Sequence, residues 1–166
     1  DSLLVCAPPE VLKKIGFNAL PVTINQQHVD YVINGTKDID HYLGEVLLKQ
    51  LPHALENPVA IFKSKSQSGR VIEIVDMKHN GKSVVAPIEI DGHSRQNNLI
   101  IDSNAVVSIY AKGNAVTKLL NDAIRDEQNG NVSIFYLNKN KASVLLQKSG
   151  LRLPSVLFRN NGFIHS

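Results

Sequence analysis

The segment from Asn104 to Lys112 carries the residue types best suited to chemistry. Its strict alternation of apolar and polar residues predicts one strand, with Asn104, Ser108, Tyr110 and Lys112 on the same face. An amide, a hydroxyl, a phenol and an ammonium in a row can hold and polarise an anion. The same alternation is also typical of the solvent-facing side of an antiparallel sheet. The pattern alone therefore does not decide between a working face and an ordinary one.

Histidine could supply the proton transfer that this face lacks, since an imidazole with an ordinary pKa of about 6.5 can take or give a proton at neutral pH. His41 differs from the other histidines because it falls in the first turn of a predicted helix, residues 39–49, with Asp38 as the N-cap. A plain helix-surface position is the simpler interpretation of His41. The second proton-transfer group is left open, with His28 and His53 as alternatives.

No arrangement of residues predicts a metal site or a cofactor. No two histidines stand four residues apart on a predicted helix, and the single cysteine, Cys6, cannot form an internal disulfide or a cysteine-based metal site by itself. The chain also lacks the GxGxxG, Walker, HExxH, CxxC and GxSxG motifs. We therefore expect no cofactor, and nucleotide-dependent and zinc-peptidase chemistry are disfavoured.

Basic residues gather at two places in the chain. The net charge of +3 permits contact with nucleic acid without requiring it. Lys63 and Lys65 lie in one serine-rich segment, and Lys139 follows an apolar run that contains Tyr136. These lysines could follow a phosphate backbone, and Tyr136 could stack on an unpaired base. More often, however, a lysine is simply a solvated surface residue and a tyrosine in such an apolar run belongs to the core.

The elements that must position these residues follow an α+β order. Hydrophobic periodicity predicts N-terminal helices packed on a small antiparallel sheet, with one helix inserted before the last strand. Asn80-Gly81 between two apolar runs predicts a hairpin, and residues 91–94 are typical of a loop. The predicted helices are 10–15, 26–33, 39–49, 114–126 and 142–149, and the predicted strands are 59–62, 71–75, 83–90, 104–112 and 132–137.

Length and composition indicate a single folded domain of 166 residues, 43% apolar and 20% charged. We expect residues 1–25 to form a lead-in, residues 26–146 approximately to form the core, and residues 151–166 to form a tail. No apolar run is long enough for a membrane helix. The start at Asp1 lacks both Met and a basic region, so we expect a fragment cut from a longer polypeptide.

Three motifs follow one another in the chain: His41-x9-Leu51-Pro52, then Glu56-Asn57-Pro58-Val59-Ala60-Ile61-Phe62-Lys63-Ser64, then Asn104-x-Val106-x-Ser108-x-Tyr110-x-Lys112. In this order they resemble the phage MuF C-terminal domain and related phage nuclease domains of the barnase, EndoU, colicin and RelE (BECR) group. The resemblance covers approximately residues 8–146, and residues 151–166 have no counterpart in it.

The resemblance implies a BECR fold and a metal-independent ribonuclease, often the toxic tip of a longer protein that is passed between bacteria or carried by phage. It assigns His41 as the acid or base, and Ser108 and Lys112 as phosphate-stabilising groups, with Tyr110 beside them. It further implies RNA as substrate, a cognate immunity protein as partner, and delivery from the producer into the cytoplasm of a target cell.

Two other classes of function are weighed against the ribonuclease. The first is a non-catalytic domain of a phage or secretion-associated protein that binds a partner through the same strand face. The second is an enzyme acting on another nucleotide, such as an ADP-ribosyl transferase, but the chain shows no convincing Ser-Thr-Ser or Glu-x-Glu arrangement for it. Convergence of His41, Ser108, Tyr110 and Lys112 on one basic cleft would favour the nuclease.

Overall fold

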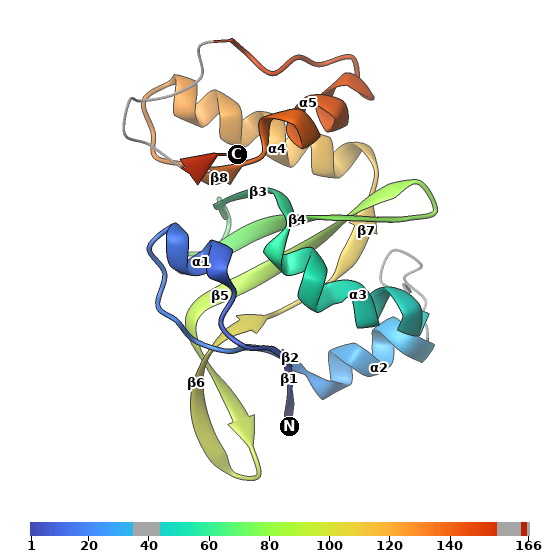
Figure 1. The fold of residues 1–166 in the computed structure, drawn as a ribbon, viewed down its shortest axis with the longest axis vertical. Coiled ribbons are helices and arrows are strands. Elements are labelled where there is room, and N and C mark those ends of the chain that lie inside the picture. Colours follow the sequence, from blue (N-terminus) through green and yellow to red (C-terminus); the bar gives the residue numbers. More distant parts are fainter. Residues whose placement is uncertain (35–43, 156–163, 166) are drawn as a thin grey trace.

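The computed structural model describes residues 1–34, 44–155 and 164–165, which form a nine-stranded sheet and five helices (Figure 1). The strands lie in the order β1-β2-β6-β5-β4-β3-β8-β9, and β7 pairs with β5. In chain order the elements are β1 (Ser2–Cys6), α1 (Glu10–Lys14), β2 (Val22–Asn25), α2 (Gln26–Asn34), α3 (Gly44–Glu56), β3 (Pro58–Lys63), β4 (Arg70–His79), β5 (Lys82–Gln96), β6 (Leu99–Val106), β7 (Tyr110–Lys112), α4 (Asn114–Gln128), β8 (Ile134–Leu137), α5 (Lys139–Gln147) and β9 (Ile164–His165).

The centre of the sheet is the predicted antiparallel meander, β3 to β6. The predicted hairpin between β4 and β5 is confirmed, because Asn80 and Gly81 both have a positive φ, of 52° and 76°. A two-residue turn in which both residues have a positive φ has a twist that matches the twist of the flanking strands. The turn sets the register between β4 and β5 over Arg70 to Val75 and at Lys78 and His79, with one irregularity between Val75 and Lys78.

The mixed α+β class is confirmed, but the sheet is larger than the sequence predicts. The expected lead-in supplies β1 and β2; a short extended segment is predicted there over residues 20–24, and β2 pairs parallel with β6. Part of the expected tail supplies β9, which pairs parallel with β8. Helices precede and follow the central meander. The sheet is thus neither small nor wholly antiparallel, whereas α4 and α5 agree with the predicted helices 114–126 and 142–149.

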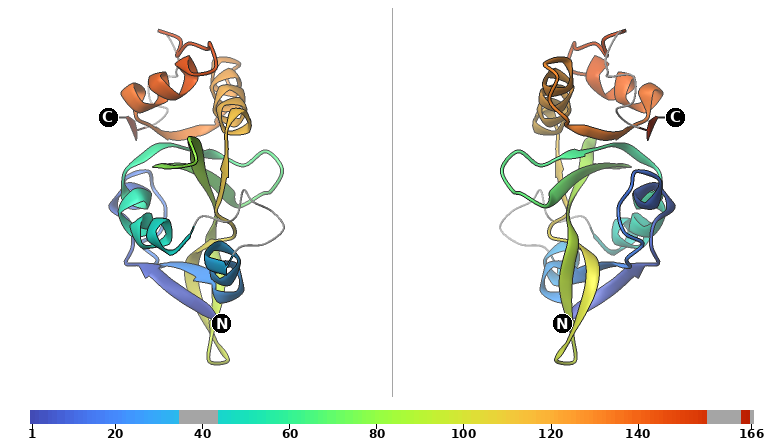
Figure 2. Two further views of the ribbon diagram at one scale, coloured as in Figure 1. Left: turned by 90° about the vertical axis from the view of Figure 1, so that its right-hand side faces the viewer. Right: turned by 90° about the vertical axis from the view of Figure 1, so that its left-hand side faces the viewer.

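Helices cover both faces of the sheet, and each face has its own hydrophobic core. The first core joins the sheet to α1, α2 and α3 through buried residues such as Leu12, Val32 and Leu55. The second core joins it to α4 and α5 through Leu120, Ala142 and their neighbours. Figures 1 and 2 show α4 and α5 together at one end of the molecule, away from α2 and α3. The sheet is therefore buried on both sides over β3, β4 and part of β5.

The expected strand from Asn104 to Lys112 is interrupted. β6 ends at Val106, and β7 begins at Tyr110. Val106 pairs with Ile88, and Tyr110 pairs with Val85. The step from Val106 to Tyr110 is four residues, whereas the matching step in β5 is three, so the segment between β6 and β7 contains one extra residue. A one-residue shift moves all later side chains to the opposite face. Val106 accordingly packs in the first core and Tyr110 against the second.

Pro87 in β5 explains where this interruption occurs. The carbonyl oxygen of Pro87 accepts a hydrogen bond from the N–H of Val107, at 3.0 Å. Pro87 has no N–H to return the second bond of a regular antiparallel pair. The hydrogen-bond ladder between β5 and its neighbour therefore breaks opposite Pro87. The apolar–polar alternation of residues 104–112 continues across this position, so it does not indicate the break.

Residues 91–94, expected to form a loop, belong to a long hairpin of β5 and β6 (Figure 1). The hairpin turns at Asn97 and Asn98, whose φ values of 48° and 68° are positive, as this kind of tight turn requires. The residues after the turn, Leu99 and Ile100, are 68% and 70% exposed. An apolar hairpin end thus projects into solvent.

A carboxyl group lies inside the first core. Glu73 of β4 is fully buried, and within the described part of the chain neither of its oxygens has a hydrogen-bond partner. Burial, and then the negative charge of Glu56, raise the pKa of Glu73 well above its ordinary range. Glu56 itself caps α1, since its carboxylate accepts hydrogen bonds from the N–H groups of Glu10 at 2.7 Å and Val11 at 3.2 Å. These surroundings therefore favour the neutral form of Glu73.

Candidate functional site

The loop that joins β3 to β4 forms one wall of a pocket of about 230 Å³. Lys63, Lys65 and Tyr110, three of the residues singled out in the sequence, line this pocket together. Three serines, one carboxylate and an apolar floor complete it: Ser64, Ser66, Ser133, Asp122, Phe62, Ile72, Leu119 and Ala123. The pocket thus combines cations and hydroxyl donors with apolar side chains.

The serine-rich loop is held by its own hydroxyl groups. The Ser64 hydroxyl accepts a hydrogen bond from the N–H of Gln67 at 3.3 Å and lies 3.4 Å from the Ser66 hydroxyl. The N–H of Ser64 donates to the carbonyl oxygen of Arg70 at 3.0 Å, which closes the loop across the ends of β3 and β4. Hydroxyl side chains stabilise tight turns in this way. The two lysines are thereby presented from a defined turn.

The opposite wall is fixed by Glu127 of α4, which is 3% exposed. One of its carboxylate oxygens accepts hydrogen bonds from the N–H groups of Ser133 at 2.9 Å and Ile134 at 2.8 Å. The carbonyl oxygen of Ser133 in turn accepts from the N–H of Lys63 at 2.8 Å. A buried carboxylate is strongly stabilised by such N–H donors. Glu127 therefore connects α4 to the start of β8 and, through it, to Lys63.

The charges at the pocket are only partly compensated. The Lys65 ammonium lies 3.1 Å from the Asp126 carboxylate, and the Lys65 side chain is 61% exposed. Lys63 is exposed at the end of β3. A second hollow of about 340 Å³ shares Lys63, Ser64, Lys65 and Ser133 with the first. An anion on this surface can therefore approach both ammonium groups from solvent.

Tyr110 supplies a phenol at the inner side of the pocket. Desolvation by burial raises its pKa above the ordinary value, so the phenol keeps its proton at neutral pH. A protonated phenol can donate a hydrogen bond to an anion. The one-residue shift before β7 places Tyr110 on this face of the sheet, opposite to that of Val106.

A histidine from α2 reaches the interruption between β6 and β7. His28 Nε2 accepts a hydrogen bond from the N–H of Ile109 at 2.8 Å. An accepting Nε2 requires the neutral ring to carry its proton on Nδ1. Ser108, the predicted phosphate-stabilising residue, is the neighbour of Ile109 and is half-buried. The structure thus brings His28, an alternative candidate for the second proton transfer, beside the Ser108 segment.

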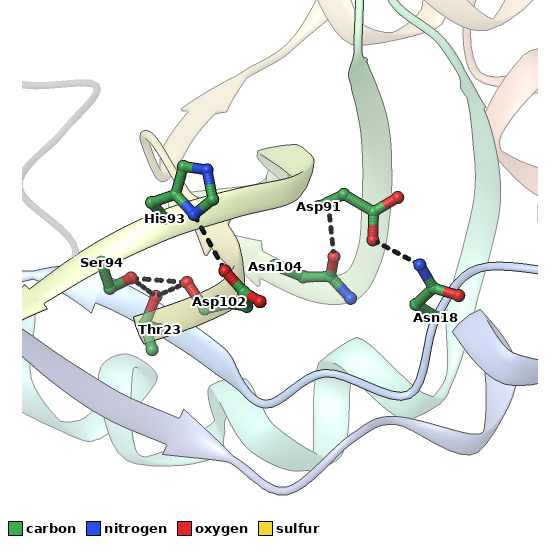
Figure 3. A network of polar contacts seen from close by, with 8 residues as sticks. Asn18, Thr23, Asp91, His93, Ser94, Asp102 and Asn104 are labelled. Atoms are coloured by element: carbon green, nitrogen blue, oxygen red, sulfur yellow. Dashed lines mark hydrogen bonds and ion pairs between the residues drawn. The ribbon is translucent and has the colours of Figure 1, made fainter. Parts of the chain in front are cut away.

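Asn104 has a structural role. It is fully buried, and its side-chain oxygen accepts a hydrogen bond from the N–H of Asp91 at 3.0 Å. The Asp91 carboxylate accepts from the Asn18 amide at 3.0 Å, and Asp91 has a positive φ of 54° (Figure 3). Asn104 thus stabilises an irregular point in β5 and does not line the pocket with Tyr110.

Serine, histidine and aspartate are also close together on the β5–β6 hairpin, but not as a catalytic triad. The hydroxyl groups of Ser94, Ser103 and Thr23 hydrogen-bond to one another inside the sheet (Figure 3). His93 Nδ1 lies 3.0 Å from a carboxylate oxygen of Asp102, and both side chains are exposed. Since adjacent residues of a strand face opposite sides, His93 cannot activate Ser94.

The other predicted site residues lie apart from the pocket or beyond what the structure describes. Tyr136 pairs with Ile61 and packs against the first core, on the other face of the sheet. Lys139 is the exposed first residue of α5. The backbone of Lys112 pairs with Ser83, while its side chain lies outside the description. His41 falls in residues 35–43, outside the described residues.

The sequence analysis missed Ser64, Ser66 and Asp122 as pocket residues. The signal for the serines was present, because they flank Lys65 in a segment already marked as rich in serine and lysine. Asp122 gave no such signal, since an acidic residue on an amphipathic helix is ordinarily solvated. Within the described residues, no group of three His, Cys, Asp or Glu side chains is arranged to hold a metal ion. None of the described helices is long and apolar enough to cross a membrane.

Comparison with known families gives a match over most of the described chain. The phage MuF C-terminal domain family matches residues 32–144, which is more than half of the chain. The matched region begins in α2 and ends in α5, so it contains the pocket, the β6–β7 interruption and the β5–β6 hairpin. Comparisons with curated proteins and with solved structures gave no match.

Proposed function

Because the chain belongs to the phage MuF C-terminal domain family, we propose that it is a metal-independent ribonuclease toxin domain of the BECR type. In this proposal it is the effector part of a longer phage or secreted protein. It acts on RNA in the cytoplasm of a target cell, and a cognate immunity protein neutralises it in the producer.

The pocket beside the β3–β4 loop is the observation that carries the proposal. Lys63 and Lys65 offer two ammonium groups, and Tyr110 and the serines offer hydroxyl donors, around an apolar floor. Phosphate oxygens accept hydrogen bonds from such donors, and an unpaired base can pack on apolar and aromatic side chains. The pocket therefore suits one nucleotide of a single-stranded RNA.

Cleavage would use the 2′-hydroxyl of the RNA as nucleophile. A base removes the 2′-hydroxyl proton, the 2′-oxygen attacks the adjacent phosphorus, and an acid protonates the departing 5′-oxygen. The products are a 2′,3′-cyclic phosphate and a free 5′-hydroxyl. We assign one proton transfer to His41 and the other to His28, with Ser108 and Lys112 stabilising the charge on phosphorus. The hydrogen bond from the Ile109 N–H holds His28 beside Ser108, and His28 can transfer a proton only once this bond opens and frees Nε2.

The test is incubation of the purified domain with total bacterial RNA in EDTA. Discrete cleavage is expected from the unmodified domain, and its loss from the His41→Ala, His28→Ala and Lys112→Ala variants. His79→Ala is the matched control, since His79 is at the end of the exposed β4–β5 hairpin. Cleavage that survives all three changes would keep the class of enzyme but reject these roles, and intact RNA would contradict the proposal.

Partner binding without catalysis is the second candidate function. The exposed side chains of Leu99 and Ile100 at the end of the β5–β6 hairpin favour it, because a projecting apolar hairpin end is suited to insertion into a partner. A binding module would leave RNA intact in EDTA and in the presence of divalent ions alike. The RNA assay therefore separates the two candidates.

A further inference from the structure

A second pocket, of about 240 Å³, lies between α5 and the strands β4 and β5. It shares no lining residue with the pocket of Lys63 and Tyr110. Three lysines from two elements surround it, Lys78 of β4 and Lys141 and Lys148 at α5. Of the three, the sequence points only to Lys141, which stands near Lys139 after the apolar run that contains Tyr136.

The walls of this pocket are mainly apolar. Its interior is formed by four buried side chains, Val59, Val75, Met77 and Leu145. Val144 is 55% exposed at the opening, although it is an aliphatic residue. The space is larger than a phosphate or carboxylate group alone would need. An occupant therefore has an apolar body as well as a charge.

The three lysines differ in their partners. The Lys141 ammonium lies 3.0 Å from the Asp76 carboxylate, which compensates its charge. Lys78 and Lys148 line the pocket from β4 and from the end of α5, and within the described residues neither forms an ion pair with a carboxylate. The neighbouring Lys78, with a smaller effect of desolvation, lowers the pKa of Lys148. When both side chains are charged, the ammonium groups of Lys78 and Lys148 repel each other.

A doubly charged anion between Lys78 and Lys148 would remove this repulsion and let both groups remain protonated. A phosphate monoester carries nearly two negative charges at neutral pH and presents three acceptor oxygens. A carboxylate carries one charge and would compensate only one of the lysines. The pair of ammonium groups thus favours a phosphate monoester, and the apolar walls favour a flat or aliphatic body attached to it.

We propose that the pocket between α5 and the β4–β5 hairpin binds a mononucleotide, with its phosphate between Lys78 and Lys148 and its base against Val144 and Leu145. This site is separate from the proposed cleavage site and does not depend on ribonuclease activity. A ligand here would connect α5 to the β4–β5 hairpin. Ser83, which lines this pocket, pairs through its backbone with Lys112 of β7.

The test is titration of the purified domain with 5′-AMP, followed by calorimetry and by ³¹P NMR. Adenosine and inorganic phosphate serve as the two halves of the ligand, and benzoate serves as a flat carboxylate. AMP is expected to bind at least about tenfold more tightly than each of these three probes. Equal binding of benzoate would overturn the choice of phosphate, and no binding of AMP at millimolar concentration would overturn the site.

Variants locate the binding. The double variant Lys78→Gln/Lys148→Gln is expected to lose at least about tenfold in AMP affinity, and Val144→Glu a similar amount because it places a negative charge at the opening. Lys49→Gln on α3 is the matched control, since Lys49 is 74% exposed and outside the pocket. A loss caused by Lys63→Gln but not by the double variant would place AMP in the other pocket and overturn the proposal. Thermal unfolding of each variant verifies that it is folded.

Discussion

At the scale of single residues, the two lysines of the β3–β4 loop give the clearest prediction for RNA binding. Lys63→Gln and Lys65→Gln should each weaken binding of a single-stranded RNA, and each should lower the slope of log affinity against log salt by about 1, the value expected for one lost phosphate contact. Fluorescence anisotropy at several salt concentrations measures both quantities. Lys65→Gln should show the smaller loss, because Asp126 already compensates Lys65.

Lys49→Gln is the control for this series, because Lys49 lies on α3, which packs on the other face of the sheet. Its ion pair with Glu45 is exposed, so its removal should change stability little. If Lys49→Gln lowers the slope as much as Lys63→Gln does, the RNA is held by overall charge rather than by this pocket.

The buried Glu73 gives a prediction about stability and pH. The unfolded chain releases this proton near the ordinary pKa of 4.5, whereas the folded protein keeps it to higher pH. The folded state therefore binds more protons in this window, and the free energy of unfolding falls as pH rises from 4.5 towards the raised pKa. Glu73→Gln cannot ionise, so it should lack this fall.

Between pH 4.5 and pH 7 the Glu73→Gln variant should gain stability relative to the unmodified domain, because its amide has no proton to lose; the amide is still a buried polar group, so the slopes of the two curves are compared. Urea unfolding between pH 4 and pH 8 measures the difference. Glu45→Gln is the control, since Glu45 is exposed on α3. Parallel stability curves for the Glu73→Gln variant and the unmodified domain would mean that Glu73 is not the group that titrates.

At the scale of elements, Glu127 of α4 is the residue on which the pocket wall depends. Glu127→Ala would leave the buried N–H groups of Ser133 and Ile134 without their acceptor. The expected loss is roughly 2–5 kcal/mol in the free energy of unfolding, together with weaker RNA binding through Lys63. Glu127→Gln keeps an acceptor oxygen and should lose less. Chemical unfolding of the two variants tests this order, and an equal loss in both would assign the effect to charge alone.

Sequence reasoning predicts some elements better than others for physical reasons. The Asn80-Gly81 turn is predictable, because local backbone preference decides it. The break before Tyr110 depends on Pro87 in a neighbouring strand and on His28 from α2, so it depends on contacts that the alternation does not contain. Proline inside the predicted strand 83–90 was the available signal.

The candidate site shows the same division. The residue types Lys63, Lys65 and Tyr110 could be selected from the sequence, because cations and phenols suit an anion. Their meeting in one pocket could not be predicted, since it needs β3, β4, β5 and β7 in this spatial order and a one-residue shift that turns Tyr110 toward the second core. Asn104 was selected for its type alone, and its burial assigns it to the structure of the hairpin instead.

At the scale of the whole molecule, the projecting hairpin and the pocket lie at opposite ends. Figure 1 shows the β5–β6 hairpin extending away from α4 and α5, and the pocket is lined by residues of α4. A protein that binds RNA at the pocket can thus use the hairpin for a separate contact with a partner. The double variant Leu99→Asp/Ile100→Asp tests whether the two surfaces are independent.

This double variant should leave RNA cleavage in EDTA within about twofold of the unmodified domain. Its stability should change by no more than about 0.5 kcal/mol per substitution, because both side chains are already exposed at 68% and 70%. Gel assays and thermal unfolding measure these two quantities, and Leu120→Asp in the second core is the contrasting variant that should unfold the domain. A large loss of cleavage in a folded Leu99→Asp/Ile100→Asp variant would show that RNA reaches the hairpin. The substrate path would then run along the whole length of β5 instead of ending near β7.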